Sequence, residues 1–211
     1  MPALEFKYSA EQEHQVDAVA AVCDLFRGQE FMSSEFTAGT VGGMFSDAIV
    51  VGHANNLRVS ARQLEENLHA VQEDNCLART EVLTDGRLRD FTVEMETGTG
   101  KTYVYIRTIY ELNKRYGLTK FVIVVPSIAI REGVKKSFES TKKHFESLYD
   151  KKPLEFFVYD SKDMGPVGNF ATSSAIQVMI INIGAFNKEL DSDEKKGTTN
   201  IFHRPSERLI G

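Results

Sequence analysis

The stretch that decides the fold lies near the middle of the chain: Phe91-Thr-Val-Glu-Met-Glu-Thr-Gly98-Thr-Gly100-Lys101-Thr102. Apolar and polar residues alternate from Phe91 to Met95, which predicts a short strand. The two glycines that follow predict a turn. From about Lys101 to Tyr116 apolar residues recur at helical spacing, which predicts an amphipathic helix. The predicted order is strand, glycine-rich turn, helix.

This order of elements suits the binding of a phosphate chain. Gly98 and Gly100 lack side chains that would keep backbone N–H groups away from phosphate oxygens. The start of the helix carries a partial positive charge. Lys101 supplies a mobile cation for the β- and γ-phosphates, and the Thr102 hydroxyl a ligand for Mg²⁺. The pattern departs from GxxxxGK[ST] at its first position, where Met95 replaces glycine.

The expected site is therefore a P-loop for ATP and Mg²⁺. Lys101 and Thr102 are its expected catalytic residues, and Thr102 is the expected metal ligand. The cofactor-binding residues expected in the loop are Thr97, Gly98, Thr99, Gly100, Lys101 and Thr102.

The second half of the chain alternates strands with helices. An apolar strand is expected at 121–125, a helix at 128–148, and further apolar strands at 156–159 and 178–183. Strands that are apolar on both faces and alternate with helices indicate a parallel sheet covered on both sides. The expected fold class is α/β, with a mainly parallel sheet flanked by helices.

The first half follows a different pattern. Its expected features are a helix at 11–26, loops or a short hairpin at 31–56 with a possible strand at 48–51, a second helix that opens at Ser60, and two strands at 81–95 around the turn pair Asp85-Gly86. We therefore divide the chain into an N-terminal part, 1–90, and a P-loop half domain, 91–211.

Composition excludes several classes of protein. Hydrophobic residues make up 42% and charged residues 26% of the chain, which is typical of a globular domain. The two cysteines, Cys23 and Cys76, form neither a metal-binding nor a disulfide pattern, which fits a reducing cytoplasm. No apolar run reaches the length of about 20 residues that spans a membrane, and no secretory leader is expected.

The net charge of −5 is unevenly distributed. Residues 1–100 hold 7 Lys and Arg against 17 Asp and Glu, whereas residues 101–211 hold 18 against 13. This balance excludes a purely basic nucleic-acid module and leaves open a polyanion-facing surface on the second half. Basic residues on and just after helix 128–148 are interleaved with acidic ones, which favours a solvated, salt-bridged face over a DNA-facing one.

Three stretches resemble the restriction (Res) subunit of type III restriction–modification enzymes, which are superfamily two helicases or translocases. They are Met95 to Tyr105, Glu111 to Gly117, and Val124 to Val134. Gln15 to Val19 is similar to the glutamine motif that precedes the P-loop in this family. The resemblance implies a partial P-loop NTPase (RecA-like) domain.

The same resemblance implies further site residues. It implies that Gln15 binds the cofactor by contacting the adenine edge, a task that suits an amide because it both donates and accepts; an ordinary surface glutamine is the alternative. His14 stands where relatives commonly place an aromatic residue. Pro126 and Ser127 are the implied DNA-binding residues, and a plain strand–helix junction is the alternative.

An acidic pair that ATP hydrolysis also needs is not evident. Asp160 follows an apolar strand, but Ser161 stands where a glutamate is required. Asp193 and Glu194 form a pair, but no strand precedes them. We therefore expect a fragment of a Res subunit that ends before the DExx motif and is inactive alone.

The intact parent implied by the resemblance is an ATP-dependent type III site-specific deoxyribonuclease. Its implied partners are double-stranded DNA and the methyltransferase/specificity (Mod) subunit, with no membrane involved. The alternatives are a fragment of another superfamily two translocase, such as a type I restriction motor or a repair helicase, and a non-catalytic nucleotide-binding module. Because strands 91–95 and 121–125 would lack neighbours, we expect the isolated chain either to aggregate or to pair these two strands directly.

Overall fold

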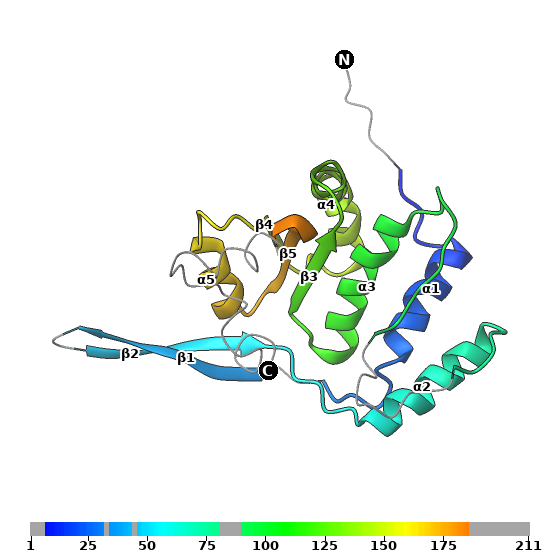
Figure 1. Ribbon diagram of the computed structural model, residues 1–211, viewed down its shortest axis with the longest axis horizontal. Coiled ribbons are helices and arrows are strands. Elements are labelled where there is room, and N and C mark those ends of the chain that lie inside the picture. The colour runs from blue at the N-terminus through cyan, green and yellow to red at the C-terminus, as the bar shows by residue number, and fades with distance from the viewer. Residues whose placement is uncertain (1–6, 32–33, 44–45, 81–89, 186–211) are drawn as a thin grey trace, which may run out of the picture.

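The computed structural model describes residues 7–31, 34–43, 46–80 and 90–185. Figure 1 shows a parallel sheet with helices on both faces and a separate antiparallel hairpin. The sheet consists of β3 (Lys120–Val125), β4 (Leu154–Val158) and β5 (Ile176–Asn182), in the order β3-β5-β4. The α/β class and the parallel strands confirm the predicted fold class.

The central strand β5 forms the middle of the core. Its residues from Ile176 to Ile181 are all buried. Val178 and Ile180 pack in the core beneath α3 (Lys101–Tyr116) and α4 (Ile128–Leu148). Met179 and Ile181 point to the opposite face, into a smaller cluster with residues of α5 (Gly165–Thr172). Helices therefore cover both faces of β5.

Helix α5 was not anticipated from the sequence. It contains two glycines, which favour a loop over a helix, although the proline in its first turn is compatible with a helix start. Val167 and Phe170 nevertheless pack against the sheet, with the ring centroids of Phe157 and Phe170 6.0 Å apart. Tertiary packing of these two side chains outweighs the weak helix propensity.

Two helices of the first half were predicted correctly. α1 (Glu13–Asp24) lies within the predicted range 11–26, and α2 (Ala61–Asp74) begins after Ser60, whose side chain accepts a hydrogen bond from the Gln63 N–H. α1 packs on α3, where Val19 and Cys23 share a buried cluster with Val104 and Leu112. The domain boundary at 90 stays a prediction, because residues 81–89 lie outside the described part of the chain.

The predicted hairpin is present and longer than expected. β1 (Ser34–Gly43) pairs with β2 (Ser46–Ala54) in an antiparallel ladder. Two amides hold its base to the rest of the molecule. Gln29 donates to the carbonyl of Asn56 and accepts from the N–H of Arg58. Asn55 accepts from the N–H groups of Thr119 and Lys120 and donates to the carbonyl of Lys120.

The strand predicted at 91–95 is wrong. These residues have no regular secondary structure, and the 81–89 portion of the predicted pair lies outside the described residues. Met95 packs near α1 and α3, in the cluster of Val19 and Val104, so the segment is not placed in the sheet. A strand needs a neighbour to bond its N–H and C=O groups, and no described strand pairs with this one. Residues 91–95 do not pair with β3 either, so the direct pairing offered as one alternative for strands 91–95 and 121–125 is not present.

The strand β3 is at the edge of the described sheet. Its alternate residues Val122 and Val124 are 48% and 50% exposed. On this face α5 packs over β4 and β5 and contacts β3 at Lys120, the first residue of the strand. The predicted cover on both sides of strand 121–125 is therefore incomplete. No helix in the described residues is long and apolar enough to cross a membrane.

Candidate nucleotide-binding site

The glycine-rich loop connects residues 91–96 to the first turn of α3. Gly98 and Gly100 have φ angles of +86° and +88°, a backbone conformation that side chains disfavour. The Thr99 hydroxyl donates to the carbonyl of Glu96 at 2.7 Å and so closes the loop on itself. The two predicted glycines are thus the residues at which the chain turns.

The start of α3 differs from the starts of α2 and α4. Ser60 and Ser127 cap those two helices with their side chains, whereas α3 has Gly100 at its N-cap and no side-chain cap. The first N–H groups of a helix lack partners within the helix and carry its positive dipole end. An uncapped helix start after a glycine-rich turn is suited to bind an anion.

The lysine of the loop folds back on the loop in this structure. Lys101 Nζ donates to the carbonyl of Glu96 at 2.9 Å, and the side chain is exposed. Thr102 follows it in the first turn of α3 and is half-buried. An incoming phosphate is a stronger partner for an ammonium group than a neutral carbonyl, so Lys101 is available to exchange Glu96 for a phosphate oxygen.

The glutamine motif and the glycine-rich loop are in direct contact. Gln15 Nε2 donates to the carbonyl of Thr99 at 2.9 Å, and His14 Nε2 lies 3.2 Å from the same oxygen. The structure therefore brings Gln15 to the predicted loop, although the two are separated by 84 residues in the chain. His14 was not predicted as a site residue, because no sequence pattern marks a side chain that bonds a backbone carbonyl.

The predicted DNA-binding residues lie at the junction of β3 and α4. The hydroxyl of Ser127 accepts a hydrogen bond from the Ile130 N–H at 3.3 Å and caps α4; Pro126 is exposed. α3 and α4 both begin at the end of the molecule where β3 finishes (Figure 1). This placement agrees with the rule that ligands bind at the carboxyl ends of parallel strands.

Of the three acidic candidates, Asp160 alone lies within the described residues. Asp160 is exposed, and its side chain accepts from the N–H of Lys162. Asp193 and Glu194 lie outside the described residues. Among the residues that the structure describes, no group of three His, Cys, Asp or Glu is placed to hold a metal ion.

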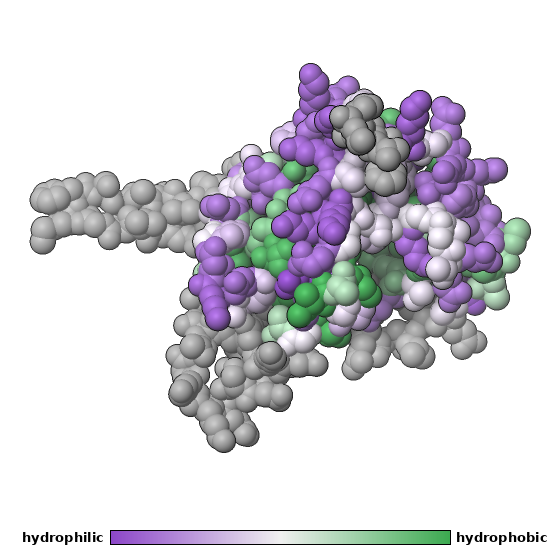
Figure 2. Space-filling model, turned by 90° about the horizontal axis from the view of Figure 1, so that it is seen from above, coloured by the Kyte–Doolittle hydropathy of each residue, from purple (hydrophilic) through white to green (hydrophobic). Residues whose placement is uncertain are grey.

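The basic residues of α4 are partly neutralised by its acidic ones. Arg131 bonds Glu132 at 2.9 Å, and Lys142 Nζ lies 4.0 Å from Glu146. These pairs support the predicted salt-bridged face. Figure 2, which looks onto the end where α3 and α4 begin, shows mostly hydrophilic side chains around a central apolar strip.

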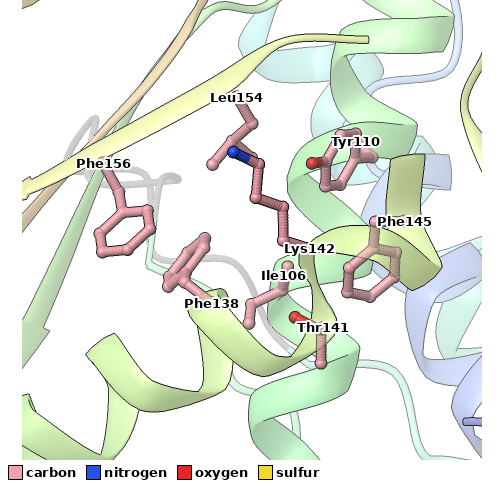
Figure 3. Close-up of a pocket in the computed structure, with 8 residues that line it drawn as sticks. All are labelled: Ile106, Tyr110, Phe138, Thr141, Lys142, Phe145, Leu154 and Phe156. Atoms are coloured by element: carbon pink, nitrogen blue, oxygen red, sulfur yellow. The ribbon is translucent and has the colours of Figure 1, made fainter. Parts of the chain in front are cut away.

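A small apolar pocket lies away from the loop. Figure 3 shows that it is enclosed by α3, α4 and β4, and that the ammonium group of Lys142 reaches over it. Its lining residues are Ile106, Tyr110, Phe138, Thr141, Lys142, Phe145, Leu154 and Phe156. Phe145, with 1% of its surface exposed, and the stacked rings of Phe138 and Phe156 make it part of the core packing.

The parallel α/β sheet and the glycine-rich loop before α3 define a helicase-like P-loop domain. Residues 12–203 match the protein family described as "Type III restriction enzyme, res subunit". The chain belongs to this family, which confirms the predicted resemblance.

Three relatives agree with this assignment. The EcoPI Res subunit of Escherichia phage P1 is 33% identical over 171 residues, and the EcoP15I Res subunit of Escherichia coli is 32% identical over 171 residues. Both alignments cover 72% of this chain and 18% of the relative. The StyLTI Res subunit of Salmonella typhimurium is 48% identical over 73 residues, 34% of this chain and 7% of the relative. The chain thus spans about a fifth of the length of the first two relatives.

Proposed function

We propose that this chain is the nucleotide-binding part of a type III Res subunit and that it binds ATP with Mg²⁺ at residues 97–102. The observation that carries the proposal is the uncapped start of α3, preceded by two glycines at positive φ and followed at once by Lys101. The loop and the first turn of α3 would bind the phosphates through backbone N–H groups.

Two side chains add charge and metal binding to this backbone cradle. Lys101 is exposed, and its partner among the described residues is the neutral carbonyl of Glu96, so its ammonium group would move to the β- and γ-phosphates. Thr102, in the first turn of the same helix, would hold Mg²⁺ through its hydroxyl. The metal, when bound, neutralises charge on the phosphates during phosphoryl transfer.

We further propose that the intact protein is an ATP-dependent, site-specific deoxyribonuclease that acts in the cytoplasm on double-stranded DNA with a Mod subunit. Family membership supports this, since the three relatives are named as Res subunits of restriction–modification enzymes. Pro126 and Ser127 are the proposed DNA contacts. Their position at the strand end nearest the loop supports a DNA backbone site beside the nucleotide.

The test of nucleotide binding is calorimetric titration of ATP into the chain and into Lys101→Ala. Charge-assisted hydrogen bonds contribute about 1.5–3 kcal/mol each, so the substitution should weaken binding about tenfold or more. Lys114→Ala serves as the matched control, because Lys114 is an exposed lysine near the other end of the same helix. Equal affinities for the wild type and Lys101→Ala would refute the proposed site.

A further inference from the structure

Tyr105, in the second turn of α3, carries a buried hydroxyl group that has no hydrogen-bond partner among the residues that the structure describes. Its ring packs against the core cluster beneath α3 and α4. Buried polar atoms in folded proteins are nearly always hydrogen-bonded, because an atom that has lost its water and found no other partner costs free energy. The buried hydroxyl of Tyr105 therefore has the capacity for a further bond, and its neighbours decide which.

The neighbour that can supply this bond is Thr102, the proposed metal ligand. Side chains three residues apart lie next to each other on the surface of a helix. Burial raises the pKa of Tyr105, and the side chain of Thr102 opposes that rise as a hydrogen-bonding neighbour. The two hydroxyl groups are thus adjacent, although they do not meet with the geometry of a full hydrogen bond. Thr102 is therefore the partner that the helix offers to Tyr105.

Thr102 in turn lacks the acceptor that a threonine usually finds within a helix. Thr108, further along α3, donates its hydroxyl proton to the Val104 carbonyl at 2.9 Å. Thr102 lies in the first turn, so the residue four positions before it, Gly98, belongs to the loop and not to the helix. A hydroxyl that gives a lone pair to a metal ion must still direct its proton to another acceptor. The buried Tyr105 oxygen is an acceptor of this kind within the protein.

We propose that Tyr105 is a positioning residue for the metal site: its hydroxyl oxygen accepts the Thr102 proton and thereby directs a lone pair of the Thr102 oxygen towards Mg²⁺. The proposal rests on the proposed nucleotide site and adds a residue to it. With Mg²⁺ on its oxygen, the Thr102 hydroxyl is a stronger donor, so its bond to Tyr105 strengthens as the metal binds. Tyr105 therefore affects nucleotide binding only through Thr102 and only when the metal is present.

The experiment titrates ATP calorimetrically into the chain with Mg²⁺ and again with EDTA in place of the metal. Tyr105→Phe keeps the ring and removes only the hydroxyl group. One neutral hydrogen bond corresponds to a change of about twofold to tenfold in affinity, so the variant should bind more weakly by that factor with Mg²⁺ and equally well with EDTA.

Tyr110→Phe is the matched control for this titration. Tyr110 is a buried tyrosine of the same helix, and its ring lines the apolar pocket away from the loop (Figure 3). Removing its hydroxyl group should change neither affinity.

A comparison of double variants shows whether Tyr105 acts through Thr102. In Thr102→Val, which has no hydroxyl, adding Tyr105→Phe should not weaken Mg²⁺-dependent binding any further. In Thr102→Ser, which keeps the hydroxyl, adding Tyr105→Phe should weaken it as in the wild type. A tyrosine that merely packs the helix would give the same loss in both backgrounds.

A measurement without ligand tests the same contact. Three-bond NMR couplings of Thr102 report the rotamer of its side chain. They should indicate a stronger preference for one rotamer in the wild type and in Tyr110→Phe than in Tyr105→Phe, where the acceptor is missing.

Four outcomes would overturn the proposal: an equal loss of affinity with Mg²⁺ and with EDTA, no loss with Mg²⁺, the same loss in the Thr102→Val background, or Thr102 couplings that Tyr105→Phe leaves unchanged. If the wild-type chain binds no ATP under either condition, the proposed function fails, and the couplings still decide whether Tyr105 positions Thr102.

Discussion

At the scale of single residues, Gly100 meets two independent constraints. Its φ of +88° disfavours any side chain, and its neighbour Gln15 leaves no room for a Cβ atom. Gly98 has almost the same φ, +86°, but a Cβ there would have no neighbour within 4 Å. Comparing a substitution at Gly98 with the same substitution at Gly100 therefore separates the effect of backbone strain from the effect of steric crowding.

We predict that Gly98→Ala lowers the free energy of unfolding by about 1–2 kcal/mol, the usual cost of a left-handed conformation for a residue with a side chain. Gly100→Ala should cost more, because the methyl group also displaces the Gln15 amide from Thr99. Urea unfolding of both variants measures the difference. Equal losses would show that the Gln15 amide moves aside at no cost.

The two thiols should differ sharply in reactivity. Burial raises the pKa of Cys23 from 9.0 to about 12, whereas Cys76 is exposed. The thiolate is the reactive form, so we predict that a disulfide reagent at pH 8 labels Cys76 quickly and Cys23 only on unfolding. In Cys76→Ser no fast thiol should remain. Two fast thiols in the native chain would contradict the burial of Cys23.

The same shift has a defined effect on stability. The folded pKa of Cys23 lies above its unfolded value, so the unfolded chain releases this proton first as the pH rises. The contribution of Cys23 to stability is therefore complete below pH 9 and is lost progressively towards pH 12.

At the scale of secondary structure elements, β3 is the exposed edge of the described sheet. Lys120 has its N–H and C=O groups bonded by the Asn55 side chain, which occupies the place of a neighbouring strand at the start of β3. Val122 and Val124 further along are about half exposed, and no described strand pairs on that side. Such an edge is a template for pairing with another chain.

We predict that the wild-type chain scatters light when heated and melts below about 60 °C, within the usual mesophilic range. Replacing Val122 and Val124 together by lysine should reduce the scattering, because charges on an edge strand oppose strand pairing. Ile128→Lys is the control, since Ile128 is 59% exposed but lies on α4. A soluble wild-type monomer that melts cooperatively above that temperature would refute the prediction.

At the scale of the whole molecule, the described residues include the proposed phosphate-binding loop, and the groups that hydrolysis would need are not found among them. Of the described strands, β3 ends at the capped start of α4, and neither β3 nor β5 is followed by a pair of carboxylates. Phosphoryl transfer to water needs a carboxylate for Mg²⁺ and a group that orients the attacking water, in addition to a phosphate cradle. The chain spans 18% of the EcoPI and EcoP15I Res subunits.

We therefore predict that the chain shows no ATP turnover above a Lys101→Ala control, with or without DNA, and no DNA cleavage. A steady-state phosphate-release assay and a plasmid cleavage assay measure these two activities. Turnover that exceeds the control would assign a role to Asp160 or Glu194, and substitution of each by alanine would show which one acts.

The sequence by itself determined the local structure and the family. Helical spacing located α1, α3 and α4, continuous apolar runs located β3 and β5, and the glycines before Lys101 marked the loop. These features depend on side chains close together in the chain, so their periodicity is visible in it. The resemblance to Res subunits of the stretches around the glycine-rich loop and around Ser127 was sufficient to predict the family.

Only the tertiary structure decided the features that depend on distant partners. Residues 91–95 alternate like a strand, but a strand requires a paired neighbour, and none is present among the described residues. α5 has a poor helix sequence and forms because Phe170 and Val167 pack on the sheet. The bond from Gln15 to Thr99 joins residues 84 positions apart, and only the packing of α1 on α3 brings them together.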